Sequence, residues 1–203
     1  VLEWLRMPGD IIFIVGGMFT CLASIDFRAA RAGGEYYALV MFPYTSGDLH
    51  IGHWYNWFGD GRNASVLSAL YSENGQHSSY SRLANNPGGE NTVIMFKSCF
   101  PNSALSGNPN DTPPAILSNP LRGQAAGSGS YTVANAKGIY TNLLSYFSTQ
   151  PNKLFVLITA PPLSDGTYSS NARALNEWLV NDWLDNYPLK NVAVFDFYTV
   201  LTT

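Results

Sequence analysis

Apolar residues in this chain occur as short uninterrupted runs between polar stretches, and several of these runs predict β-strands. Each is rich in β-branched or aromatic residues, and Pro, Gly or Asn lies nearby. Runs without polar alternation are typical of strands covered on both faces, so they favour a parallel sheet. The clearest predicted strands span residues 36–42, 92–96, 154–158 and 192–195.

Between these strands, apolar residues spaced three and four apart predict helices that pack on the sheet. A short helix is expected at 65–70, and Pro151 ends a longer one. The alternation of strands and helices predicts an α/β fold, a three-layer α/β/α arrangement with a mainly parallel sheet between helical layers. The two longer helical faces are formed by Ala136, Ile139, Tyr140, Leu143, Tyr146 and Phe147, and by Ala172, Leu175, Leu179 and Trp183 within 171–185.

Sites in such folds lie beyond the carboxyl ends of the strands. The positions to search are therefore the loops after Phe42, Phe96, Ile158 and Asp196. Residues 101–130 are dense in Pro, Gly, Asn and Ser, which predicts a long ordered loop near these ends.

The apolar run 11–23 has two open interpretations. It is shorter than the ~20 residues that a membrane-spanning helix needs, so a membrane partner is not expected. It fits either a buried strand or helix or a targeting segment, since periodicity does not separate short apolar runs. We predict an atypical N-terminal apolar segment at 1–34 and a single α/β domain at 35–203. The location is undetermined, with secretion favoured over the cytoplasm.

The amino-acid composition limits the classes of partner and ligand that this chain is expected to bind. The net charge of −3 provides no basic surface for a phosphate backbone, so a nucleic-acid partner is not expected. Two cysteines and three histidines are too few and too scattered for a structural metal site, and no metal or cofactor is predicted. The oligomeric state is left open.

The sequence His50-Ile51-Gly52-His53 follows the first predicted strand and a Pro/Gly turn. With its flanks, residues 36–55, it resembles the HIGH-motif region of leucyl-tRNA synthetase. The resemblance implies a Rossmann-type segment whose histidines stabilise charge on ATP phosphates. The second signature of those enzymes, a Lys-Met-Ser-Lys-Ser loop, is missing. Nucleotide binding through the HIGH motif is therefore the weaker alternative function.

The segments 93–103, 153–163, 171–184 and 192–201 together resemble the SGNH/GDSL hydrolase superfamily, a resemblance that extends over about 51–203. The resemblance implies an SGNH-type, flavodoxin-like fold and a serine esterase acting on a small-molecule ester or an acylated carbohydrate. It also implies a serine nucleophile, asparagine and glycine oxyanion donors, and an Asp-x-x-His pair. This chain departs from the pattern, because it has neither a Gly-Asp-Ser-Leu motif nor a histidine after His77.

Three residues are predicted to be catalytic. Ser46 follows the first predicted strand, where the resemblance places the nucleophile, and His50 or His53 is the nearest base, with His53 assigned. Asn102 follows the strand at 92–96 and is assigned as the oxyanion donor. Ser46 also fits an ordinary turn serine, and Asn102 also fits a loop-shaping residue beside Pro101.

Nearby residues have two interpretations each. Ser98 and Cys99 align closer than Asn102 to the family's oxyanion position. Cys99 also fits a nucleophile or, as we expect in the absence of an identifiable histidine partner, a buried inert thiol. Lys97 either binds an acidic group or extends to solvent. Asp196 is either a site carboxylate or the cap of the following turn.

The two resemblances meet near residues 51–58, which suggests the hypothesis of a chimeric chain. On the resemblance to SGNH/GDSL hydrolases, the predicted function is ester hydrolysis. The alternative is a catalytically silent, truncated or chimeric α/β domain with a ligand-binding pocket.

Overall fold

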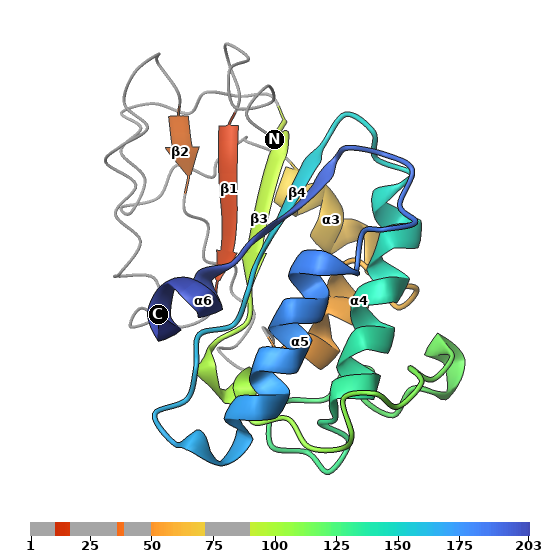
Figure 1. The fold of residues 1–203 in the computed structure, drawn as a ribbon. Helices are drawn as coiled ribbons and strands as arrows, with labels where there is room; N and C mark the ends of the chain where they lie inside the picture. Colours follow the sequence, from red (N-terminus) through yellow and green to blue (C-terminus); the bar gives the residue numbers. More distant parts are fainter. Residues whose placement is uncertain (1–10, 17–35, 39–49, 72–89) are drawn as a thin grey trace.

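The computed structural model describes residues 11–16, 36–38, 50–71 and 90–203, which form a parallel sheet with helices against it (Figure 1). All strand pairs are parallel, in the order β2-β1-β3-β4-β5. The strands are β1 (Ile11–Gly16), β2 (Tyr36–Ala38), β3 (Val93–Lys97), β4 (Leu154–Ile158) and β5 (Val192–Phe195).

The helices occupy the connections and one end of the sheet (Figure 1). No helix within these described ranges is long and apolar enough to cross a bilayer. The α-helices are α2 (Trp54–Trp57), α3 (Ala64–Tyr71), α4 (Val133–Phe147), α5 (Ser169–Asn181) and α6 (Phe197–Thr202), and the 3₁₀ turns are η3 (Ile51–His53), η4 (Phe100–Ser103), η5 (Ile116–Ser118) and η6 (Gly166–Tyr168).

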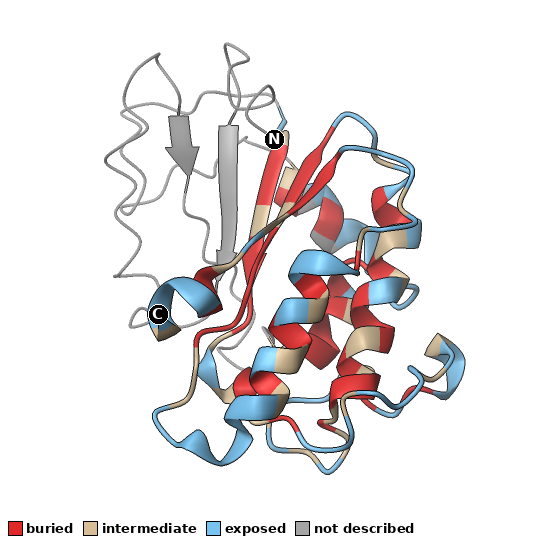
Figure 2. Ribbon diagram, viewed as in Figure 1, coloured by how far each residue is buried: buried red, intermediate tan, exposed pale blue. Residues whose placement is uncertain are grey.

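One face of the sheet carries the main apolar core. Alternate residues of β3 and β4 point to opposite faces, and Ile94 and Phe96 join Phe155 and Leu157 in one buried cluster. Helices α2 to α5 all contribute side chains to this same cluster, so they cover the same face. Figure 2 shows the buried residues concentrated where these helices meet the strands.

The predicted α/β class and parallel sheet are confirmed, and so are the long helices. All six apolar positions predicted on the first long helix are buried. The second long helix ends at Asn181, four residues earlier than expected, and Trp183 is buried just beyond its end. The third layer and the SGNH type of the fold stay predictions.

The N-terminal apolar run supplies a strand that the sequence left open. Ile11–Gly16 is β1, and it pairs with β2 on one side and β3 on the other. The sheet therefore crosses the predicted boundary at residue 34. Tyr36–Ala38, expected to begin the first strand, is the second strand and lies at the sheet edge. Strand pairing is a long-range interaction, so a short apolar run did not reveal it.

We expect Phe58→Ala to destabilise the fold strongly. Phe58 is fully buried, and its ring centroid lies 5.2 Å from that of Phe96 and 5.5 Å from that of Phe147. Removing such a ring leaves a cavity that typically costs about 3–5 kcal/mol. Urea denaturation measures the change, and Leu117→Ala, at a side chain 77% exposed, is the control expected to stay within about 0.5 kcal/mol. Equal effects of the two substitutions would contradict this account of the core.

Candidate functional site

The His-Ile-Gly-His sequence lies against the chain that leaves strand β3. Residues 51–53 form η3, which runs directly into α2. Ile51 and Trp54 are buried in the main core, and they anchor this segment on the helix-covered side of the sheet. The Trp54 indole N–H donates to the Ser98 hydroxyl over 2.8 Å, a direct link between α2 and the end of β3.

Asn102 joins the two segments through hydrogen bonds on both sides of its amide. Its Oδ1 accepts from the backbone N–H of Ile51 (2.9 Å) and from the Tyr131 hydroxyl. Its Nδ2 donates to the Cys99 carbonyl (2.9 Å) and lies 3.1 Å from Nδ1 of His50. Because Oδ1 is held by two donors, the amide orientation is fixed, and Nδ2 is the group that faces His50.

The same bonds determine which imidazole nitrogens carry protons. Nδ1 of His50 accepts from Asn102, so the neutral ring has its proton on Nε2. Nδ1 of His53 faces the backbone N–H of His50 at 3.4 Å, which assigns the same tautomer by its hydrogen-bond partner. The ring centroids are 5.5 Å apart. Both imidazoles therefore carry an Nε2–H donor, a group suited to an anion rather than to accepting a proton.

Tyr131 was not identified from the sequence, although it holds this network together. Its hydroxyl donates to Asn102 and accepts from the Ile51 N–H over 3.0 Å. Burial raises the pKa of the Tyr131 hydroxyl, so it stays protonated and able to donate. It lies 80 residues from Ile51 in sequence, and no local pattern signals such a contact.

The other predicted site residues lie outside the histidine–asparagine network or outside the described residues. Ser46 lies outside the described residues. Ser98 is 1% exposed, and its oxygen is held by the Trp54 indole, so it is part of the core. Asp196 caps helix α6, accepting from the Thr199 N–H over 3.1 Å, which is one of the two predicted roles.

The structure brings Asn102 and His50 into contact and places His53 beside His50, while Tyr131 supports them. Within the described part of the chain, no group of three or more His, Cys, Asp or Glu side chains gathers as a metal site would require. These residues can therefore position hydrogen-bond donors, and their combined chemistry favours binding of an oxygen-rich anion.

A small hollow lies beside the same edge of the sheet, between the β4 exit, the start of α5 and α6. Among the described residues, its lining includes neither His53 nor Asn102, and it is formed by Ser103, Pro162, Leu163, Tyr168, Ala172 and Tyr198, among others.

Gly52 of the tetrad is closed off by the chain itself. An added Cβ would lie 2.2 Å from the Leu121 carbonyl oxygen and 2.4 Å from that of Gln124. The Gly52 carbonyl also accepts from the Gly123 N–H over 2.8 Å. The loop at 121–124 thus packs the tetrad against the body of the domain.

Comparison with known proteins finds short segments of high identity. The chain is similar to a leucine–tRNA ligase from Deinococcus radiodurans, 74% identical over 29 residues, which is 14% of this chain and 4% of that protein. It is also similar to a leucine–tRNA ligase from Dehalococcoides mccartyi, 76% identical over 21 residues, which is 10% of this chain and 3% of that protein. These matches support the HIGH-motif resemblance.

The chain thus covers only a few per cent of these relatives. No family model matches the chain, and no solved structure matches it. The resemblance to SGNH/GDSL hydrolases gains no support from these comparisons.

We expect Gly52→Ala to destabilise the protein because the new methyl group would meet backbone atoms that have no room to move aside. Overpacking of this kind typically costs about 1–3 kcal/mol. The control is Gly129→Ala, where an added Cβ meets nothing within 4 Å. Chemical denaturation of both variants measures the difference, and a Gly52→Ala protein as stable as the control would refute the described packing of the tetrad.

Proposed function

We propose that this chain is an α/β domain that binds a small phosphate-bearing ligand, of the nucleotide class, through His50 and His53 at the carboxyl end of β3. The observation that carries the proposal is the hydrogen-bond geometry at Nδ1 of the two imidazoles. Each Nδ1 is an acceptor within the protein, at Asn102 and at the His50 N–H, so each Nε2 carries a proton. Preorganised N–H donors are the groups that stabilise phosphate oxygens.

Two further observations support this ligand class. The chain shares short segments with leucine–tRNA ligases, proteins that by name join leucine to tRNA. The tetrad also lies at the carboxyl edge of a parallel sheet, the edge at which α/β folds bind small ligands.

We expect magnesium ATP to raise the melting temperature of the wild-type protein. A ligand at one hundred times its Kd stabilises by about 2.7 kcal/mol, which corresponds to a shift of about 5–10 °C for a domain of this size. His50→Asn keeps polar atoms near Nδ1 but removes the Nε2 donor, so it should lose most of the shift. His50→Gln restores an amide near Nε2 and should retain more of it.

Differential scanning fluorimetry at constant ionic strength measures all three proteins, with sodium chloride as the reference salt. A shift that sodium chloride reproduces, or that His50→Asn leaves unchanged, would exclude the histidine pair as the phosphate-binding group.

The second candidate is ester hydrolysis by an SGNH-type domain, and the placement of Asn102 favours it. Asn102 lies in η4, five residues after the end of β3, and its Nδ2 is 3.1 Å from Nδ1 of His50. An oxyanion would have to take the place of this contact or of the bond to the Cys99 carbonyl. In this proposal Ser46 is the nucleophile, His53 is the base and Asn102 is the oxyanion donor, acting on a small ester or an acylated carbohydrate. His53 would first have to exchange its tautomer, because a base needs an unprotonated nitrogen facing the serine.

Hydrolysis of p-nitrophenyl acetate tests this candidate. If the chain is an esterase, we expect Ser46→Ala to lower turnover by at least about 10³-fold, since the nucleophile and base act as one unit. Ser98→Ala is the control, because its hydroxyl is held by Trp54 and should not react. Wild-type turnover no faster than the buffer, or equal rates in wild type and Ser46→Ala, would rule out the serine mechanism.

A further inference from the structure

Lys97 lies at the point where the connections of the sheet change direction. It is the last residue of β3, aligned with Gly16 at the end of β1 and with Ile158 at the end of β4. From β1 the sheet continues to β2 on one side and to β3, β4 and β5 on the other. In open parallel sheets, ligands bind at the carboxyl ends of the strands at this reversal.

The side chain of Lys97 is buried without compensation. It is 1% exposed, and its Nζ has no hydrogen-bond partner among the described residues. The sequence had left open an extension to solvent, and this burial excludes it. A buried ammonium group without a counter-charge is unfavourable, so an anion bound beside Lys97 would stabilise it.

Another buried lysine in the same chain shows how the fold satisfies such a group. Lys153 is 6% exposed, and its Nζ binds Glu90 (3.0 Å) and the Asn91 carbonyl (3.0 Å) and lies over the Tyr71 ring. Lys153 stands at the opposite end of β4 from the candidate site, where its role is structural. Lys97 has none of these partners among the described residues, and it stands at the ligand-binding edge.

The direction of Lys97 sets it apart from the histidine network. Strand residues alternate between faces, and Phe96 points into the helix-covered core while Lys97 shares the opposite face with Val93 and Met95. Its neighbour across the strand pair is Gly16, the last residue of β1.

We propose that Lys97 is an anion-binding residue that takes an oxyanion, the phosphate or carboxylate of a small ligand, at the reversal between β1 and β3. This goes beyond the proposed function because Lys97 and the histidine pair belong to different faces of the sheet. The charge of the ligand replaces the missing counter-charge, so binding and the stability of the fold are coupled through this one ammonium group.

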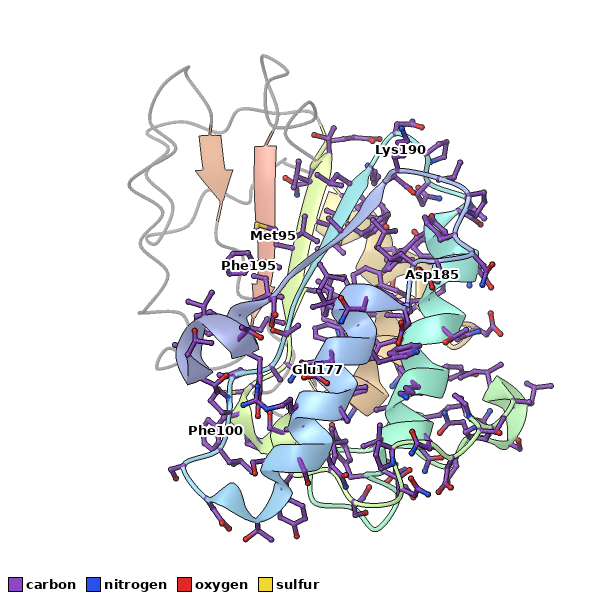
Figure 3. All side chains as sticks on the ribbon, in the orientation of Figure 1. Met95, Phe100, Glu177, Asp185, Lys190 and Phe195 are labelled. Carbon is purple, nitrogen blue, oxygen red and sulfur yellow. The ribbon has the colours of Figure 1, made fainter. Side chains whose placement is uncertain are left out.

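The test compares the full-length wild-type chain with Lys97→Met and with the control Lys190→Met. Lys190 is exposed in the loop before β5, far from the carboxyl ends of the strands (Figure 3). Its substitution by Met removes the same positive charge as Lys97→Met. Melting temperatures are measured in sodium phosphate, sodium acetate and sodium chloride at equal ionic strength. The phosphate and acetate arms distinguish the two oxyanions.

We expect phosphate or acetate to raise the melting temperature of the wild type and of Lys190→Met by at least about 3 °C over chloride. A shift of this size corresponds to an oxyanion concentration of several times its Kd. Lys97→Met should show no such rise, and without added oxyanion it should melt above the wild type, because an apolar side chain replaces an unpaired charge. An oxyanion response retained in Lys97→Met, or absent from the wild type, would overturn the proposal.

A second measurement avoids dependence on the folding of the variant. In wild-type protein with ¹³C-labelled lysine, the Cε NMR signal of Lys97 is identified as the one that Lys97→Arg lacks. Its chemical shift should change on addition of the same oxyanion, while that of Lys190 stays constant. An unmoved Lys97 signal at saturating oxyanion would overturn the proposal. His50→Asn should keep this movement, so a failure of nucleotide binding at the histidines is distinguishable from a failure at Lys97.

Discussion

The structure depends on one aromatic cluster that joins α2 to the centre of the sheet. Trp54 and Phe58 pack against Phe96 at ring-centroid distances of 5.1 and 5.2 Å, and Phe147 stacks on Phe155 at 4.0 Å. Since aromatic rings bury more apolar area than most side chains, these contacts hold a short helix that would be unstable alone. The position of α2 in turn fixes the tetrad that precedes it.

The candidate site is a consequence of that anchoring. With α2 held on β3, the Ile51 N–H reaches Asn102, and Asn102 then reaches His50. A buried amide with a fixed orientation leaves few choices for its neighbours, because each unsatisfied group would be costly. The result is a pair of histidines whose Nδ1 atoms each face a hydrogen-bond donor of the protein. The hydrogen bonding of His50 therefore depends on Asn102 and, through it, on Tyr131, and not on the tetrad alone.

Much of the fold was predictable because its signals are local. The helical face from Ala136 to Phe147 and the run Leu154–Ile158 are read directly from periodicity and apolar content, and the structure has both. The site was less predictable, since the contacts of Asn102 with Ile51 and Tyr131 span 51 and 29 residues. The sequence suggested Asn102 from its place after a strand, but it held no signal for Tyr131.

By itself, the sequence determined the α/β class, the parallel character of the sheet and the histidine tetrad, because apolar periodicity and residue identity are properties of neighbouring positions. The tertiary structure alone decided that Ile11–Gly16 is an inner strand, that Asn102 assigns the protons of His50, and that Lys97 is enclosed without a partner among the described residues. Each of these depends on which distant segments meet, and pairing between segments arises only when the whole chain buries its apolar faces together.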